Sequence, residues 1–400
     1  MSPVRDFDHH HPEFVTEHAS VYQQFRENCP VAHTSAYGGF WVVSSYESVF
    51  AAAHDDATFS SAREVVIPST GVGRLIPLQS DPPTLTRYRA LLAPFFAPPA
   101  LEAATIPFLE RRIDDCIDSF IERGQVELVS ELANPIPSSV TMFLLGLDPA
   151  DWRIFADPLH SLSYSAPDSP TRLQAQEEVR GFTEYIGREI RDRIVRPRED
   201  MISALLGSSW EGIDTTLDEV IDLVRMVIFG GMDTVMAALS NMFVRFGDDP
   251  RLWRHLVTSP SDIPRAIEEL LRIDAPVQGF ARTTTCPAEL GGVSIPEGDS
   301  IFMLWASANL DEQEFGPDAG EVNIQRHPNR HMTFGVGAHR CMGSTLARIE
   351  LSRILRRLAE RTPDLSIVLS EVVAPDTIGI VKGFRRVPAT FTPGPRIHSA

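Results

Sequence analysis

The chain has 400 residues, of which 43% are hydrophobic and 22% are charged; this is enough apolar sequence for a large buried core and excludes a disordered or fibrous protein. Its net charge of −18 argues against nucleic acid as a partner, because proteins that bind nucleic acids present basic surfaces. The four cysteines lack C-x-x-C spacing, so the sequence indicates neither a disulfide framework nor a zinc ribbon and fits a reducing cytosol. Three of them, Cys29, Cys116 and Cys286, are expected to be structural.

The N-terminal region indicates neither export nor a membrane anchor. Arg5, Asp6 and Asp8 precede three histidines at 9–11, and the region lacks the apolar core of a signal peptide. No run of about 18 apolar residues is present to span a membrane. We therefore expect a cytoplasmic protein without a membrane partner, in which the three histidines form an exposed segment rather than a metal site.

The predicted elements are mostly helical. The first 60 residues read as mainly irregular or helical, with a short strand at 39–43. From Asp81 onward helical periodicity dominates, and Pro82 and Pro83 are typical of a helix start. The predicted helices are 86–96, 100–123, 127–145, 173–194, 216–246, 263–272 and 344–357, with further strands at 281–290 and 378–391. The sequence thus predicts one mainly α domain over 1–400 with a small β-rich lobe, an N-terminal segment at 1–20 and a C-terminal tail at 392–400.

The longest predicted helix, 216–246, begins with a capping box formed by Thr216 and Glu219 and ends before Gly247. Its length of about 30 residues is far above the usual length of about 11–12 residues. Gly230 and Gly231 lie in its middle, where each glycine costs about 1 kcal/mol relative to alanine. Close packing against another helix is one explanation for them.

The segment 334–343 has the pattern F-G-x-G-x-H-x-C-x-G and places Cys341 directly before a predicted helix. A thiolate is a soft ligand for iron, zinc or copper(I). Backbone N–H groups exposed by the three glycines, together with the positive end of the following helix, can stabilise this anion. Because no second Cys or His lies at chelating spacing, Cys341 suits the single axial ligand of a haem better than a zinc cage. The alternative is a small buried apolar residue.

This pattern resembles the cysteine-ligand loop of the cytochrome P450 superfamily, of the soluble bacterial type. The resemblance implies a fold in which haem b lies between a long central helix and the ligand loop, with the Cys341 thiolate bound to the iron. The other residues that it implies as haem contacts are Phe334, Gly335, Gly343, Gly230, Arg89, Arg282 and His339, the last three as partners of the propionates. Leu85 stands where the family commonly has histidine, and Arg87 or a different group is expected to compensate.

The resemblance also assigns a role to the paired glycines. Residues 230–234 match the family's (A/G)-G-x-(D/E)-T segment, where the glycines let haem and O2 approach the backbone. Asp233 and Thr234 then form a catalytic acid–alcohol pair that delivers the protons needed to cleave the O–O bond. The alternatives are a surface charge for Asp233 and a core position for Thr234.

Glu269 and Arg272 lie three residues apart on one predicted helix, which is usually a solvated pair. They resemble the family's E-x-x-R pair, and Arg326 occupies the position that completes a buried Glu–Arg–Arg cluster. Because breaking a buried charge pair is costly, this cluster is predicted to be structural and to support haem incorporation.

The resemblance places a substrate pocket above the haem. Its predicted lining is the loop 72–78, including Leu75 and Ile76, together with Met226, Phe229, Gln278, Phe280, Ile380 and Val381. These residues are largely apolar, as expected for a site that binds a hydrophobic molecule, although each could also be ordinary core. Gln278 is a candidate hydrogen-bonding group, and Arg74 is a candidate partner for an acidic or polar substrate tail.

The predicted activity is that of a monooxygenase that inserts one oxygen atom from O2 into an apolar small molecule, by hydroxylation or epoxidation. The chain has neither a Gly-rich dinucleotide loop nor a cysteine set for an iron–sulfur cluster, so electrons are expected from a separate ferredoxin and ferredoxin reductase. A docking patch is predicted from Arg87, Arg112, Arg330, Arg340 and Arg348. The alternatives are a peroxide-driven peroxygenase, a haem-binding sensor without turnover, and a hydrolase with Cys341 as nucleophile and His339 as base.

Overall fold

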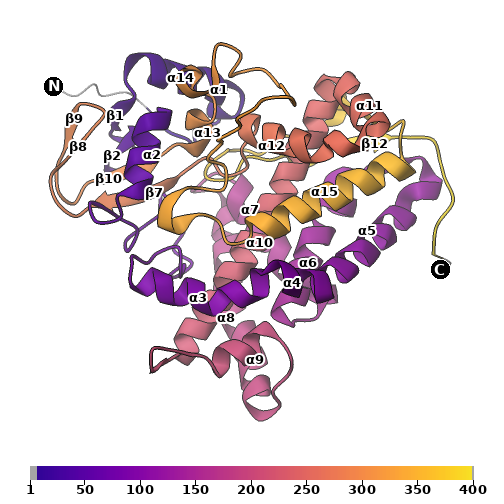
Figure 1. Cartoon of the computed structure of the whole chain (residues 1–400), viewed down its shortest axis with the longest axis horizontal. Helices are drawn as coiled ribbons and strands as arrows, with labels where there is room; N and C mark the ends of the chain where they lie inside the picture. The colour runs from indigo at the N-terminus through magenta and orange to yellow at the C-terminus, as the bar shows by residue number, and fades with distance from the viewer. Residues whose placement is uncertain (1–6, 399–400) are drawn as a thin grey trace.

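Helices make up most of the structure, a computed structural model that describes residues 7–398 (Figure 1). The helices are α1 (Phe14–Asn28), α2 (Tyr46–His54), α3 (Thr84–Phe96), α4 (Pro98–Ala100), α5 (Ile106–Phe120), α6 (Pro135–Leu145), α7 (Trp152–Tyr164), α8 (Pro170–Val195), α9 (Met201–Leu206), α10 (Leu217–Asp248), α11 (Pro250–Thr258), α12 (Ile263–Ile273), α13 (Trp305–Ala308), α14 (Glu312–Phe315) and α15 (Ser344–Arg361). The mainly α prediction is confirmed.

A five-stranded sheet forms the β-rich lobe, which lies beside α1 and α2 at the upper left of Figure 1. Its order is β1 (Val31–Thr34), β2 (Phe40–Val43), β10 (Ser300–Met303), β7 (Phe280–Thr284) and β3 (Phe59–Ser60). Only the β2–β10 pair is parallel in this sheet; the other neighbours are antiparallel. The smaller sheets are β11 (Ser366–Ile367), β12 (Pro388–Thr390) and β4 (Gln125–Glu127), and the pairs β5 (Ser209–Trp210) with β6 (Ile213–Asp214) and β8 (Ala288–Leu290) with β9 (Val293–Ile295).

The central helix α10 begins where the sequence predicts. The Thr216 hydroxyl accepts the Glu219 amide, and the Glu219 carboxylate accepts the Thr216 amide at 2.8 Å, so the capping box is formed. The two glycines of this helix have different surroundings. A Cβ at Gly231 would collide with the Thr141 side chain of α6, whereas the nearest atom to a Cβ at Gly230 is the Met226 Cε at 3.7 Å. Close helix packing therefore explains Gly231, and Gly230 needs a separate reason.

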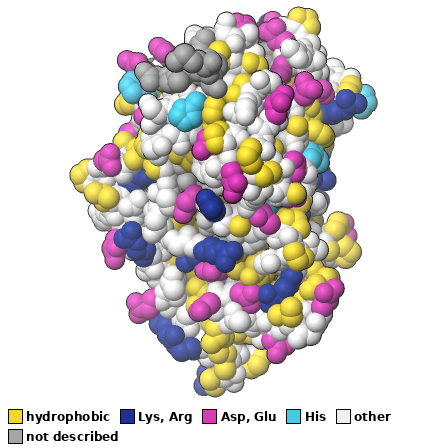
Figure 2. Space-filling model, turned by 90° about the vertical axis from the view of Figure 1, so that its left-hand side faces the viewer, with side chains coloured by type: hydrophobic (Ala, Val, Ile, Leu, Met, Phe, Trp, Pro, Cys, Tyr) yellow, Lys and Arg dark blue, Asp and Glu magenta, His cyan; other side chains and the backbone are white. Residues whose placement is uncertain are grey.

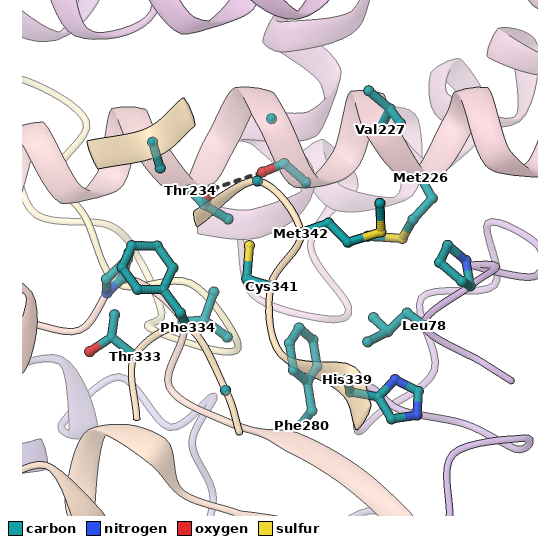
Figure 3. Close-up of a pocket in the computed structure, with 18 of the residues that line it drawn as sticks. Leu78, Met226, Val227, Thr234, Phe280, Thr333, Phe334, His339, Cys341 and Met342 are labelled. Atoms are coloured by element: carbon teal, nitrogen blue, oxygen red, sulfur yellow. Dashed lines mark hydrogen bonds between the residues drawn. The ribbon is translucent and has the colours of Figure 1, made fainter. Parts of the chain in front are cut away.

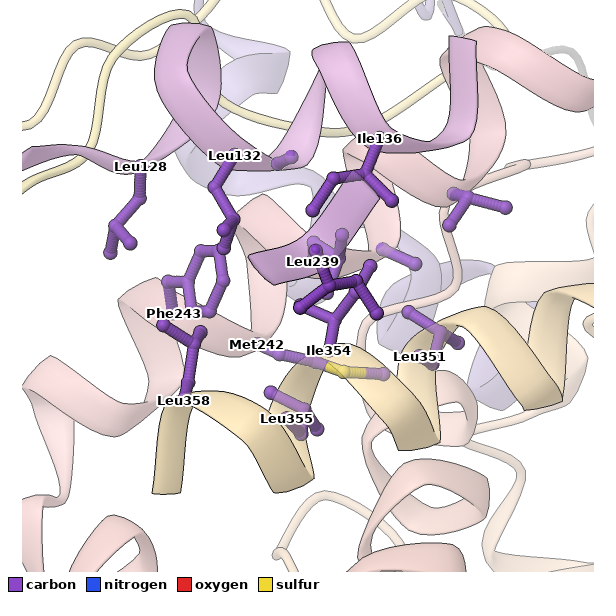
Figure 4. Packing of buried hydrophobic residues seen from close by; sticks show 14 of the residues in the cluster. Leu128, Leu132, Ile136, Leu239, Met242, Phe243, Leu351, Ile354, Leu355 and Leu358 are labelled. Atoms are coloured by element: carbon purple, nitrogen blue, oxygen red, sulfur yellow. The ribbon is translucent and has the colours of Figure 1, made fainter. Parts of the chain in front are cut away.

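A continuous apolar core fixes α10 against α6 and α15 (Figure 4). Leu239, Met242 and Phe243 of α10 are at most 2% exposed. They pack with Ile136 of α6 and with side chains of α15. Full burial of one such apolar side chain stabilises the folded state by about 1.5–3 kcal/mol. The α15 side chains labelled in Figure 4 are Leu351, Ile354, Leu355 and Leu358. Because α15 directly follows the Cys341 loop, this core sets the position of that loop relative to α10.

Several predicted boundaries differ from the structure because of proline and of irregular helical turns. The predicted helix 100–123 is divided into α4, a π-helical turn at Leu101–Thr105 and α5, and the predicted helix 127–145 contains a second π-helical turn at Val129–Ala133. Of the predicted strand 378–391, only β12 forms a strand. The segment before β12 makes isolated bridges instead, such as Val277 with Val381.

The prediction of an exposed histidine segment is wrong for two of the three residues. His9 and His10 are at most 5% exposed, and the His9 ring stacks on Phe302 of the sheet. Their polar atoms contact the Ile67 carbonyl and the Thr377 hydroxyl, which offsets part of the cost of burial. Burial lowers the pKa of His9 to about 4, so its ring is neutral at neutral pH. Residues 7–398 hold no cluster of metal-binding side chains.

One helical run, Thr84–Arg123, is long and apolar enough to cross a membrane by length and composition, although the sequence analysis finds no such run. A single helix of this kind is weak evidence for a membrane segment, because core helices pass the same test. Here Leu85, Arg89, Leu92 and Phe96 of the run line an internal cavity.

Candidate active site

A cavity of about 290 Å³ separates α10 from the Cys341 loop (Figure 3). Gly230, Gly231 and Thr234 of α10 line one side, and the thiol of Cys341 points toward them from the other. The remaining walls include α3 and the start of β7. All eight predicted haem contacts line this cavity: Phe334, Gly335, Gly343, Gly230, Arg89, Arg282, His339 and Cys341.

The Cys341 loop is a tight turn that packs on α2. Gly335 and Gly337 have φ of 64° and 69°, a region that favours glycine. A Cβ at Gly337 would lie 2.5 Å from the Ala53 carbonyl oxygen, so the loop can approach α2 only without a side chain there. The Cys341 amide donates to the Phe334 carbonyl at 2.8 Å and closes the turn.

The electrostatic field at the thiol is mixed. Burial raises the pKa of Cys341 above its ordinary value, while a hydrogen bond from the Gly343 amide and the charges of Arg89 and Arg348 act in the opposite direction. Of the three glycine amides expected to face the sulfur, only that of Gly343 contributes. The protein groups around Cys341 therefore act on its thiol in both directions.

The polar groups around the cavity fit the two propionates of a haem. His339 Nε2 is buried without a hydrogen-bond partner, and Arg89 forms no ion pair with any described residue. Arg282 differs, because its Nη1 already contacts Asp56 at 2.6 Å and the Phe59 carbonyl at 3.0 Å. A group with acidic oxygens would satisfy Arg89 and His339 directly.

The structure gives Leu85 and Arg87 different surroundings. Leu85 is 1% exposed and lines the cavity, so its side chain adds apolar surface where the family commonly has histidine. Arg87 does not line the cavity; its guanidinium pairs with Glu219 at 2.7 Å and also donates to the Asp214 carbonyl. Arg87 is therefore the wrong candidate for the compensating group.

The structure agrees with neither alternative for these two residues. Asp233 is not a surface charge, and Thr234 is not a core position. The Thr234 hydroxyl lines the cavity and donates to the Gly230 carbonyl at 2.8 Å (Figure 3). Asp233 is 7% exposed and its carboxylate accepts a hydrogen bond from Ser163 of α7. His160, one turn earlier on α7, has its Nδ1 3.7 Å from the same carboxylate. The sequence carries no signal for Ser163 or His160, because they lie about 70 residues away.

A second chamber of about 140 Å³ adjoins the first, since Met226, Gly230, Thr234 and Phe280 line both. Its walls are mostly apolar. They include the predicted pocket residues Leu75, Met226, Phe229, Phe280, Ile380 and Val381.

Three predicted pocket residues lie elsewhere. Gln278 is 1% exposed, and its amide accepts a hydrogen bond from the Tyr22 hydroxyl at 2.8 Å and donates to the Ala275 carbonyl at 2.6 Å. Ile76 is 2% exposed and belongs to the apolar core. Arg74 donates to the Gln79 carbonyl and lines neither chamber. The predictions for these three residues are therefore wrong: local sequence placed them in the right segment but could not give their side-chain direction.

Glu269, Arg272 and Arg326 are brought together as the sequence predicts. Arg272 donates twice to the Glu269 carboxylate, at 2.7 and 2.9 Å, and Arg326 Nε lies 3.2 Å from it. Neither Glu269 nor Arg272 is more than 1% exposed. The cluster also includes Asn323 and Asn329, which donate to the carboxylate and which the sequence analysis missed.

A further buried acid lines the main cavity. Glu350 of α15 is 3% exposed and has no ion pair with any described residue. Burial raises its pKa to about 8, so it holds a proton at neutral pH. Glu350 could not be identified from the sequence, because a single acid in a helix carries no local signal of burial.

The comparisons with known proteins agree with this geometry. A family model described as Cytochrome P450 matches residues 263–361. Cytochrome P450 130 of Mycobacterium tuberculosis (strain ATCC 25618 / H37Rv) is 32% identical over 367 residues, covering 88% of this chain and 90% of the relative. Steroid C26-monooxygenase of the same strain is 30% identical, with 95% of each chain covered. The structure of CYP109Q5 from Chondromyces apiculatus matches with a TM-score of 0.85 and 26% identity, over 97% of this chain and 99% of that one. This chain therefore belongs to the cytochrome P450 family, as a monooxygenase of the bacterial type.

Proposed function

We propose that this P450 inserts one oxygen atom from O2 into an apolar small molecule, as a hydroxylation or an epoxidation. The observation that carries the proposal is the cavity between Cys341 and the Gly230–Thr234 turn of α10, with a buried acid directly behind the threonine. A sensor without turnover would have no use for this acid–alcohol pair. A hydrolase with Cys341 as nucleophile would leave the cavity unexplained.

Haem b, when bound in this cavity, would supply the iron chemistry that activates O2. Cys341 Sγ is the proposed iron ligand, at the start of α15, where the positive helix end and the Gly343 amide favour its anion. Arg89 and His339 are proposed to bind the propionates, because both have unused donors beside the cavity. Arg282 contributes less, since Asp56 already balances its charge.

Thr234 and Asp233 are proposed to move protons on the distal side. The Thr234 hydroxyl faces the cavity and is held by the Gly230 carbonyl, so it can hold a water or an oxygen atom of O2 in place. Asp233 precedes Thr234 and lines the second chamber, and its carboxylate accepts a hydrogen bond from Ser163 of α7, with His160 Nδ1 3.7 Å away. His160 Nδ1 is buried without a hydrogen bond, which suits a group that passes protons to Asp233.

The mostly apolar second chamber supports an apolar substrate above the haem. One relative is named for a steroid monooxygenase reaction, and one similar structure, that of CYP109E1 from Bacillus megaterium, holds testosterone. We propose Met226, Phe229 and Phe280 as its principal contacts, since Met226 and Phe280 line both chambers and Phe229 lines the second.

Electrons are proposed to come from a ferredoxin and its reductase in the cytoplasm. Three of the five predicted docking arginines are already paired with carboxylates, which weakens their charge: Arg87 with Glu219, Arg330 with Glu314 and Arg348 with Glu268. Arg112 and Arg340 pair with no carboxylate among residues 7–398 and are the better candidates. On the face drawn in Figure 2, acidic and basic side chains are interspersed rather than separated by sign.

Two measurements test this proposal. The reduced protein with carbon monoxide should show the spectrum of a thiolate-bound haem, and Cys341→Ser should lose it. With a reductase system and isotopically labelled O2, one labelled atom should enter the product. Oxidation that proceeds faster with hydrogen peroxide than with O2 and reductant would favour the peroxygenase, which typically lacks the acid–alcohol pair.

A further inference from the structure

The second chamber contains one buried cation among apolar walls. Arg172, the third residue of α8, is 4% exposed and lines this chamber but not the haem cavity. Apolar side chains such as Leu75, Leu159 and Ile380 form most of the other walls. Polar side chains, Thr70, Ser163 and Asp233 among them, complete the lining. A buried arginine normally has a carboxylate partner, because an unpaired charge is costly to desolvate.

Arg172 has no such partner among the described residues. Its Nη1 donates to the carbonyls of Leu162 at 2.7 Å and Ser165 at 3.2 Å, at the end of α7, and no hydrogen bond occupies Nε or Nη2. Asp168 is close enough to act through its charge, but it is exposed and forms no ion pair with Arg172. The carbonyl oxygens stabilise the cation without neutralising it.

Two further features make this position suited to an anion. Arg172 lies in the first turn of α8, where the helix dipole disfavours a cation and favours an anion. His10 lines the same chamber, and its Nε2 is buried without a hydrogen-bond partner. The site therefore offers unused guanidinium donors and one unused imidazole nitrogen to a single ligand.

We propose that the substrate is an apolar molecule carrying one carboxylate, which pairs with Arg172 and Nε2 of His10. This inference rests on the proposed function and names its substrate class. The carboxylate binds in the part of the second chamber that the haem cavity does not share, so the apolar body extends past Met226 and Phe280 toward Cys341. Oxidation then occurs at a carbon remote from the carboxylate. Arg172 takes the role that the sequence analysis gave to Arg74.

The test is a spin-state titration of the ferric holoenzyme with straight-chain and fused-ring carboxylic acids, each paired with its methyl ester. The two ligands of a pair differ mainly in the charge that Arg172 would recognise. Hydrogen bonds to charged groups are strong, so the acid should bind about ten- to a hundred-fold more tightly than its ester. Arg172→Gln should remove this preference, and Arg172→Lys should retain part of it. Arg188→Gln, an exposed arginine of the same helix, is the matched control and should leave the preference unchanged.

The outcomes separate this inference from a structural role and from the proposed function. If Arg172 only holds the end of α7, Arg172→Gln will weaken acid and ester equally and the preference will persist, which overturns the inference. Equal binding of acid and ester by the wild type overturns the inference as well. This comparison needs only the wild-type protein, so it decides the question even if Arg172→Gln does not fold. A thiolate-type carbon monoxide spectrum with no acid binding refutes the carboxylate inference alone. If the wild-type holoenzyme lacks that spectrum, the proposed function is refuted.

Discussion

Replacing Glu269 by glutamine tests what holds the segment before the Cys341 loop. The carboxylate accepts hydrogen bonds from Arg272, Arg326, Asn323 and Asn329. Arg272 in turn donates to carbonyls of the segment after α13, at Asn309, Ala319 and Glu321. Burial alone would raise the pKa of Glu269, but these hydrogen bonds and charges keep it below its ordinary value, so the group is ionised at neutral pH.

The expected loss follows from the charge that remains. In Glu269→Gln, the guanidinium of Arg272 stays 0% exposed without its counter-ion, and Arg326 adds a second positive charge nearby. Removing one partner of a buried pair costs about 3–5 kcal/mol, which is a large share of a typical total stability of about 5–15 kcal/mol. Because the segment leads to Cys341, haem incorporation should fall as well.

Urea unfolding followed by circular dichroism, together with the haem content of the purified protein, measures both effects. Glu177→Gln is the matched control: Glu177 is 76% exposed and pairs with Arg180 on the surface, so its loss should cost less than about 1 kcal/mol. A Glu269→Gln protein that is within about 1 kcal/mol of wild type and fully loaded with haem would refute the reasoning.

Three other changes have distinct expected results. Thr234→Ala should leave substrate binding intact but lower the product formed per reductant consumed, with hydrogen peroxide released; unchanged coupling would contradict the role of the hydroxyl. Because the pKa of Glu350 is about 8 when folded and 4.5 in its ordinary state, the folded protein binds the extra proton, and stability should fall as pH rises between these values by up to about 1.4 kcal/mol per pH unit. Glu350→Gln should flatten this dependence in urea unfolding measured from pH 5 to 8, and parallel curves would count against it. Gly231→Ala should lose about 1–3 kcal/mol through overpacking, and adding Thr141→Ala should restore most of it; a double variant as unstable as the single one would exclude that contact as the cause.

The parts of the site that could be predicted from the sequence are local. The Cys341 loop, the turn at 230–234 and the Glu269–Arg272 pair each involve residues a few positions apart, so spacing alone indicates their neighbours. The long helix was predictable for the same reason, since its capping box lies within four residues. Their chemical roles remain predictions.

The parts that could not be predicted depend on tertiary packing. Asp233 meets Ser163 and His160 only because α7 lies against α10, and nothing in their sequence separation indicates this contact. His10 looked exposed because its sequence neighbours are polar, yet the chain folds it onto Thr377. Arg172 resembled any other helix arginine until its surroundings were known.

The paired glycines of α10 have a consequence for changing this enzyme. Position 231 is restricted by Thr141 of the neighbouring helix, whereas position 230 meets no neighbouring helix and borders both chambers. The two adjacent glycines are therefore required for different reasons. Substitutions at position 230 would change the walls of both chambers and so the selectivity of the enzyme. Substitutions at position 231 would mostly give protein that does not fold.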